Sequence, residues 1–215
     1  MSEAAITPHE RATRSPLAYL GAALAAGLLV GLATSFGQGL LPDHLNSLAN
    51  SSGSWSLIAF LVATACPRPR VAAAMGVLAL LAMVAGYDIA SGLRGYATSL
   101  GASAFWLVAA VAVGPFLGLG GSAVRTRSQF APAAIGAMSG VLVGEGAYGL
   151  TVIADTTSPP YWWGSIAVGA GMLGWAIVRR FPAWRPALVA TGVTALIAGG
   201  FVAAYTAAPL LLMSF

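Results

Sequence analysis

The sequence predicts an all-α, polytopic membrane helix bundle of seven transmembrane spans, with the N-terminus inside the cell and the C-terminus outside. Three observations lead to this fold class. Apolar residues make up 58% of the 215 residues and charged residues only 7%, whereas about a quarter of a soluble domain is charged. Apolar runs recur at lengths near the roughly 20 residues that a span needs. Arginines return at every second joint between these runs.

Short polar or proline-rich joints divide the apolar runs from one another. The predicted spans are residues 17–40, 53–66, 71–89, 101–121, 131–153, 162–178 and 187–210. Because every joint is short, we expect a cytoplasmic tail over residues 1–16 and a single membrane domain over residues 17–215. The first run, Leu17 to Leu32, follows two arginines as a signal peptide would. It is long for a cleaved segment and no A-x-A site follows it, so we expect it to be retained as a span.

The distribution of arginine predicts the orientation. The chain contains no lysine, and nine of its ten arginines fall on the N-terminal side of the predicted bundle. Only Arg94 falls on the opposite side, together with Asp43, Asp88 and Asp155. Short cytoplasmic joints collect basic residues, so the N-terminal side is expected to be cytoplasmic. A multi-pass protein of the plasma membrane follows, and arginine without lysine suggests a GC-rich bacterial genome.

Spans two to seven can be written as three hairpins. Each opens with tryptophan (Trp55, Trp106, Trp162), turns on an arginine pair and returns through a helix rich in small residues. Internal duplication explains this pattern, and repeats are common in transporters. The general placement of aromatic and basic residues at membrane interfaces explains it without any duplication, and is the favoured explanation.

Glycines at four-residue spacing predict close helix packing, because lipid provides no hydrophobic drive that brings helices together. Gly27 and Gly31 have this spacing in the first span, and Gly114 and Gly118 have it in the fourth. The fifth span carries three such glycines: Gly136, Gly140 and Gly144.

Glu145 is the ionisable residue that lies well inside a predicted span, about 21 Å along the fifth helix at 1.5 Å per residue. An ionised carboxylate is costly in hydrocarbon and normally faces the bundle or a wet cavity. Glu145 is therefore a candidate proton or cation site, and Tyr148 shares its helix face. The alternative is a structural ion pair with Arg94 that orders the outer loops.

The second predicted span is too short for a membrane. Ser54 to Cys66 is 13 residues, or about 20 Å of helix, against a hydrocarbon core of roughly 30 Å. The polar segment before it must therefore continue the helix or form irregular backbone against protein or water.

With Glu145, the residues Gln38, Asn50, Asp88 and Tyr148 are candidates for an outward-facing polar vestibule. The alternative is an amphipathic surface helix, capped by Asp43 after Pro42.

Several function classes find no support. The chain has no H-E-x-x-H zinc motif and no G-x-S-x-G nucleophile elbow, and its two histidines lie in the N-terminal tail and an outer loop. We therefore predict no catalytic residue, no metal site and no cofactor. The pI near 9.7 follows from the cytoplasmic arginines, so no nucleic-acid partner is expected. The expected partner is the lipid bilayer, with a homo-oligomer or a membrane partner protein left open.

Two short motifs carry a resemblance to a known family. Leu48-Ala49-Asn50-Ser51 leads into Trp55, and Gly144-Glu145-Gly146 lies in the fifth span. With the seven-span length, these resemble an actinobacterial family of small multi-span integral membrane proteins with no assigned function. The resemblance covers most of the chain and implies neither an activity nor any site residue.

Two functions remain. The first is a small transporter or solute-binding membrane component, with Glu145 as its ionisable centre and polar lining from Gln38, Asn50 and Tyr148. The second is a non-transporting accessory or assembly subunit, whose glycine rows dock it to another membrane protein.

Overall fold

A computed structural model describes residues 15–96 and 100–212. The described elements are α-helices and one short 3₁₀ helix. In order they are α1 (Pro16–Leu40), α2 (Asp43–Asn46), η1 (Ser47–Asn50), α3 (Ser52–Ala63), α4 (Pro69–Leu93), α5 (Leu100–Thr126), α6 (Ala131–Thr151), α7 (Pro159–Arg179) and α8 (Trp184–Leu212). The all-α prediction is confirmed.

Six of the described helices, α1 and α4 to α8, are long and apolar enough to cross a membrane. Each corresponds to a predicted span. The remaining predicted span, 53–66, corresponds to α3, which has only 12 residues and a length of about 18 Å. The segment before α3 forms α2 and η1 rather than one long surface helix. Asp43 is the first residue of α2, and the N-cap residue Pro42 makes no side-chain hydrogen bond, so the expectation that Asp43 caps this helix is wrong.

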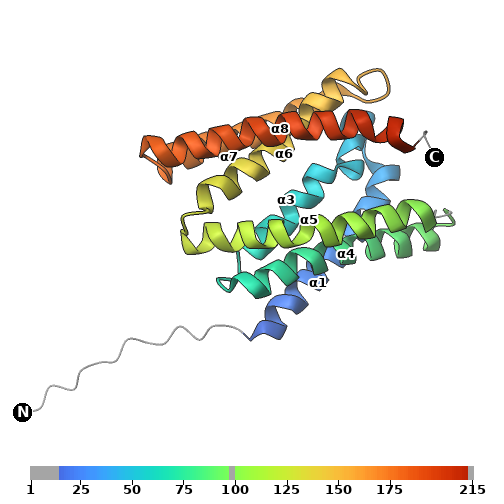
Figure 1. Cartoon of the computed structure of the whole chain (residues 1–215). Coiled ribbons are helices and arrows are strands. Elements are labelled where there is room, and N and C mark those ends of the chain that lie inside the picture. Colours follow the sequence, from blue (N-terminus) through green and yellow to red (C-terminus); the bar gives the residue numbers. More distant parts are fainter. Residues whose placement is uncertain (1–14, 97–99, 213–215) are drawn as a thin grey trace, which may run out of the picture.

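The long helices form two groups of three, which lie on either side of α3 (Figure 1). In the first group α4 packs between α1 and α5, and in the second α6 packs between α7 and α8. We call these the α4 group and the α6 group. The helices run in the same relative directions in both groups: the central helix has one parallel neighbour (α1 or α8) and one antiparallel neighbour (α5 or α7). The glycine contacts of the two groups establish these directions.

Glycine sets the helix spacing in the α4 group. Gly27 of α1 faces Ala79 and Ala82, and Gly31 faces Met83, so residue numbers increase together and α1 runs parallel to α4. On the other side of α4, Gly118 of α5 lies against the backbone of Ala72. A Cβ at these glycines would collide with backbone atoms of the neighbouring helix.

The α6 group uses the glycine row of the fifth predicted span. Gly136, Gly140 and Gly144 of α6 all face α8, where they meet Ala190, Thr194 and Ala198. The Thr194 hydroxyl also donates to the Gly136 carbonyl at 3.1 Å. The predicted close packing is confirmed, and these rows are occupied by contacts inside the chain. They are therefore not free to dock another protein.

The packing does not follow the three hairpins read from the sequence. The closest helix neighbours are α1 with α4, α6 with α8 and α4 with α5, whereas the hairpin partners α7 and α8 touch little. The units that pack are the α4 group and the α6 group, which are joined through α5 with α6, α3 with α6 and α2 with α7.

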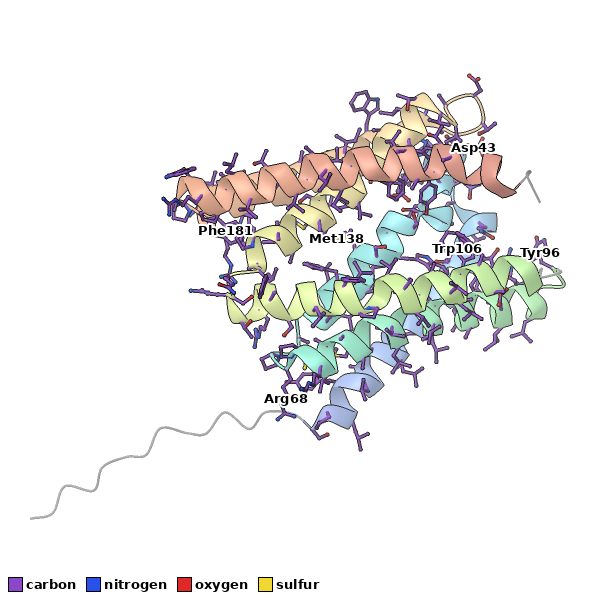
Figure 2. The ribbon with its side chains drawn as sticks, in the orientation of Figure 1. Asp43, Arg68, Tyr96, Trp106, Met138 and Phe181 are labelled. Atoms are coloured by element: carbon purple, nitrogen blue, oxygen red, sulfur yellow. The ribbon has the colours of Figure 1, made fainter. Side chains whose placement is uncertain are left out.

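Because α1 and α4 run in the same direction, the chain between them must return from the end of α1 to the start of α4. The segment that returns contains α2, η1 and α3. Arg68 and Phe181 lie at one end of the bundle, and Asp43 and Tyr96 lie at the other (Figure 2). We call the end with Arg68 the arginine-rich end. The short α3 therefore begins inside the bundle, between the two groups, and ends toward the arginine-rich end.

Candidate functional site

The carboxylate of Glu145 lies at the N-terminus of α3. Its Oε1 accepts from the Gly53 amide at 2.9 Å and from the Ser52 hydroxyl at 3.1 Å. Its Oε2 accepts from the Ser51 hydroxyl at 2.7 Å. The side chain is only 4% exposed. The first amides of a helix have no acceptor within the helix, and the helix dipole places positive charge there. A carboxylate of the α6 group thus satisfies the N-terminus of a helix that packs mainly on the α4 group.

Both serines are oriented to donate to this carboxylate. The Ser51 oxygen accepts from the Ser54 amide at 2.8 Å, as the N-cap of α3. The Ser52 oxygen lies 3.0 Å from the Tyr205 hydroxyl of α8, which can donate to it. With these acceptor positions used, the hydroxyl protons point to Glu145. The arrangement supplies three donors to one buried carboxylate, which compensates for its removal from water.

Tyrosines surround the serines. Tyr205 stacks on Phe201 with ring centroids 4.3 Å apart and meets the edge of Tyr148 at 5.5 Å. Tyr161, at the start of α7, reaches Ser51 and Ser54 with its hydroxyl. Tyr148 therefore contacts the site through the Tyr205 ring, and its own ring takes part in packing.

Arg94 has other partners than Glu145. Its guanidinium donates to the backbone carbonyl and the hydroxyl of Ser35, near the end of α1. It also lies over the rings of Phe36 and Tyr96, at 5.1 and 4.9 Å. A cation at the C-terminal end of a helix interacts favourably with the last carbonyls. Arg94 thus fastens α4 to the end of α1, and the ion pair considered between Arg94 and Glu145 is not formed.

The other candidate residues are divided among separate contacts. Gln38 accepts from the Tyr87 hydroxyl at 3.0 Å, and Asp88 accepts from the Ser103 hydroxyl at 2.8 Å. Both side chains are half-buried, and both hold helices of the α4 group together. The side chain of Asn50 lies outside the described part of the chain. Glu145 and Tyr148 are therefore the candidates that the structure brings together.

A cavity of about 230 Å³ adjoins the carboxylate site between the two groups. Its polar lining comes from Ser52 and Tyr205, which take part in the site, and from Ser56. The aromatic part of its lining comes from Trp55, Trp106 and Phe201. Trp55 is held by its indole N–H, which donates to Thr34 at 3.1 Å. The space is mainly apolar, with hydroxyl groups at the side that faces Glu145.

Among the described residues, no three His, Cys, Asp or Glu side chains gather closely enough to hold a metal ion. Sequence reasoning did not single out Ser51, Ser52, Gly53, Tyr161 or Tyr205 as partners of Glu145. The available signal was the polar stretch before a span that was too short. It indicated irregular backbone before α3 but could not show which residue of a distant helix would satisfy it.

Gly53 allows the carboxylate to approach the helix. A Cβ built on Gly53 would collide with Glu145 Oε2 and lie 3.0 Å from its carboxyl carbon. We expect Gly53→Ala to displace the carboxylate and to lower the free energy of unfolding by about 1–3 kcal/mol, the range for overpacking. Unfolding in mixed detergent micelles would measure it. Gly164→Ala, where nothing lies within 4 Å, is the matched control, and equal stability of the two variants would contradict the contact.

The comparison with protein families defines the class to which the chain belongs. By its fold the chain is a membrane-helix protein, with helices apolar enough to contact the lipid bilayer. Residues 10–210 match the family of unknown function DUF6518, and the chain belongs to this family. The expected membership of a family with no assigned function is thereby confirmed. No curated protein and no solved structure matches the chain.

Proposed function

We propose that this protein is a small transporter, or solute-binding membrane component, in which Glu145 couples a proton to movement of the α4 group against the α6 group. One observation supports this function above the others: a buried carboxylate of one group binds the N-terminus of a half-length helix that packs on the other. Broken helices whose N-termini lie near mid-membrane recur at the binding sites of secondary transporters.

The coupling follows from hydrogen-bond chemistry. An ionised Glu145 accepts from the Ser51 hydroxyl, the Ser52 hydroxyl and the Gly53 amide. A protonated carboxyl group adds a donor where three donors already converge, and it loses its attraction to the helix dipole. Protonation therefore weakens the contact that joins α3 to α6. The two groups can then move apart at the cavity by turning about the contacts that still join them, α5 with α6 and α2 with α7.

The cavity indicates the class of solute. Its volume of about 230 Å³ is below the roughly 300–1,000 Å³ of pockets for drug-sized ligands. The lining offers aromatic rings from Trp55, Trp106 and Phe201, and hydroxyl groups from Ser52 and Tyr205. This lining suits a small, mainly apolar molecule with one polar group, and that polar group would compete for the hydroxyls that now support Glu145.

The proposal includes a placement in the membrane. The six long helices cross it, and the α2–η1–α3 segment makes the seventh crossing, with α3 in the half nearer the arginine-rich end. That end faces the cytoplasm, because arginine-rich joints are retained there. Residues 17–215 then form one membrane domain in the plasma membrane of a bacterium. Irregular backbone at the depth of Ser51 is tolerated because it is buried against protein.

The test measures proton movement in liposomes. The full-length protein is reconstituted with a pH-sensitive dye inside, and a panel of small apolar amines, alcohols and phenols is added outside. We expect solute-dependent changes of internal pH with the wild-type protein. Glu145→Gln should fall to the rate of empty liposomes, because it keeps the shape and one acceptor oxygen but cannot take up a proton.

Asp88→Asn is the matched control, since Asp88 is a half-buried carboxylate that binds Ser103 outside the site. It should retain the wild-type rate. Solute-dependent proton movement that persists in Glu145→Gln would exclude Glu145 as the coupling residue. Its absence from the wild type across the panel would favour the second function.

That second function is an accessory or assembly subunit, and a different set of glycines favours it. The rows named from the sequence are used inside the chain, but Gly164 and Gly171 of α7 and Gly192 and Gly199 of α8 have nothing within 4 Å. Both helices are mostly exposed on their apolar surface. A second copy of the chain or a membrane partner protein can approach such faces closely.

A further inference from the structure

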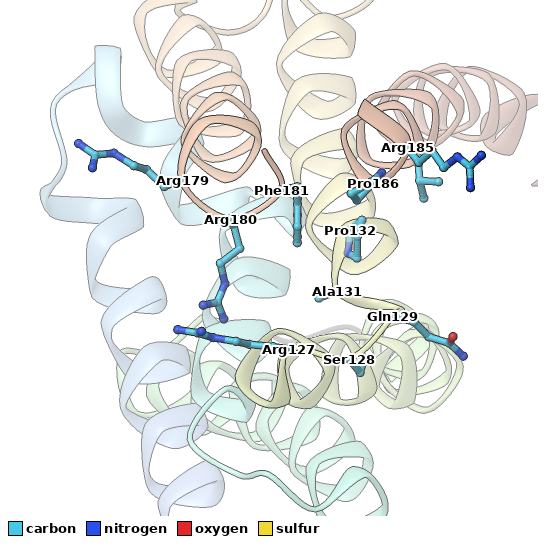
Figure 3. A pocket seen from close by; sticks show the side chains of 11 residues that line it. Arg127, Ser128, Gln129, Ala131, Pro132, Arg179, Arg180, Phe181, Arg185 and Pro186 are labelled. Atoms are coloured by element: carbon cyan, nitrogen blue, oxygen red, sulfur yellow. The ribbon is translucent and has the colours of Figure 1, made fainter. Parts of the chain in front are cut away.

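A second cavity opens at the arginine-rich end, on the α6 group beside the end of α5. Its volume is about 540 Å³, within the range typical of ligand sites. Its walls come from the α5–α6 turn, the start of α6, the end of α7 and the start of α8. Four arginines line it: Arg127, Arg179, Arg180 and Arg185. Arg180 extends toward Arg127, whereas Arg179 and Arg185 point away on opposite sides (Figure 3).

Arg180 is held in place by a backbone carbonyl, and Arg127 has an unusual backbone conformation. Arg180 donates to the carbonyl of Val124 at 2.8 Å, at the end of α5. Arg127 follows the last residue of α5 and has a φ of 55°. The Ser128 amide bonds back to the Ala123 carbonyl at 3.0 Å, which is the helix ending that normally places glycine at this position. The chain thus has an arginine where glycine would cost less backbone strain.

The positive charge of the cavity has no acidic partner in its lining. Every ionisable residue that lines it is an arginine. The acidic residues among those described are Asp43, Asp88, Glu145 and Asp155. They lie in or next to the helix ends opposite the arginine-rich end, or in the last turns of α6. The tail over residues 1–14 contains two glutamates and two arginines, so its sequence offers no net negative charge to neutralise the cavity.

The rim of the cavity is apolar and faces outward. Val189 lines it, and the neighbouring Leu188 is 62% exposed. Phe130 and Trp184, which are next in the chain to the lining residues Ala131 and Arg185, are also exposed, as aromatic residues at a membrane interface are. A ligand that places negative charge between the arginines therefore has an apolar surface on α8 for a hydrocarbon chain.

We propose that this cavity binds the phosphate group of an anionic phospholipid, with the phosphate between Arg127 and Arg180 and an acyl chain along α8. Guanidinium groups bind phosphate oxygens through paired N–H donors. Basic pockets between membrane helices are suited to anionic headgroups. The apolar rim favours a lipid over free phosphate, which shares the charged group but has nothing to place on Val189 and Leu188. This site is independent of the proposed transport function.

The experiment titrates the full-length protein in neutral detergent with phosphatidylglycerol and follows bound lipid by native mass spectrometry. We expect Arg127→Gly to bind phosphatidylglycerol about fivefold more weakly, the effect of one arginine near a lipid surface. The same variant should melt at or above the wild-type temperature, since glycine is favoured at a positive φ. If Arg127 served only the fold, its replacement would not lower lipid affinity while leaving the melting temperature unchanged or higher. Arg180→Gln should weaken binding at least as much.

Arg125→Gln is the matched control: Arg125 is exposed at the same end but does not line the cavity, so its variant should bind as the wild type does. Equal affinity of Arg127→Gly and Arg125→Gln would overturn the proposal. Equal affinity of the wild type for phosphatidylcholine and phosphatidylglycerol would also overturn it. Displacement of the lipid by inorganic phosphate at an equal concentration would show a free-phosphate site and would overturn the assignment to lipid.

Discussion

Replacing Glu145 with alanine is expected to lower the free energy of unfolding by about 3 kcal/mol or more, because three donors, two of them buried, lose their acceptor at roughly 1–3 kcal/mol each. These donors are the hydroxyls of Ser51 and Ser52 and the amide of Gly53. The variant also leaves the positive end of the α3 dipole without its anion. Detergent-driven unfolding in mixed micelles measures the loss.

Double-mutant cycles then identify the partner of the carboxylate. Ser51→Ala should couple with Glu145→Ala, since the two side chains are hydrogen-bonded at 2.7 Å. Arg94→Ala should be additive with Glu145→Ala to within about 0.5 kcal/mol, as expected for residues without shared partners. Coupling of Arg94 with Glu145, and none with Ser51, would contradict the site as described.

The long helices could be predicted because membrane burial leaves a strong local signal. Each span needs a continuous apolar run, so composition predicts where α1 and α4 to α8 lie. Their ends are less well predicted: α5 continues to Thr126, five residues beyond the predicted span. The four-residue spacing of Gly136, Gly140 and Gly144 predicted close packing correctly, since that spacing places small residues on one helix face. It could not identify α8 as the neighbour, because helices adjacent in the chain need not pack together.

The sequence singled out the carboxylate of the candidate site but not the groups that bind it. A carboxylate within an apolar helix must find donors, and this singled out Glu145 as a candidate. Its donors lie more than 90 residues away in the chain, and two of them are ordinary serines. Arg94 was the plausible partner by charge, but a guanidinium is equally well satisfied by the terminal carbonyls of a helix, and Ser35 at the end of α1 provides one. Charge complementarity alone therefore did not determine the pairing.

Gly118→Val is expected to have the second large effect on stability. The Cβ alone would collide with the carbonyl oxygen of Ala72, and the Cα of Ala73 would lie 2.6 Å from it. Both are backbone atoms that cannot rotate away, so α4 and α5 would have to separate. Overpacking of this kind costs about 1–3 kcal/mol and occasionally more, and a β-branched residue is expected at the upper end of that range. Thermal unfolding in detergent measures the change.

Gly171→Ala in α7 is expected to change the stability in the opposite direction. Nothing lies within 4 Å of a Cβ at this position, and alanine in a helix interior is favoured over glycine by up to about 1 kcal/mol. The purified chain should therefore gain stability. If Gly171→Ala instead lost stability only when the protein is an oligomer or is bound to a membrane partner, the open face of α7 would be an occupied interface. That outcome would favour the accessory function, since Gly118 would remain essential to the fold while Gly171 served only the partner.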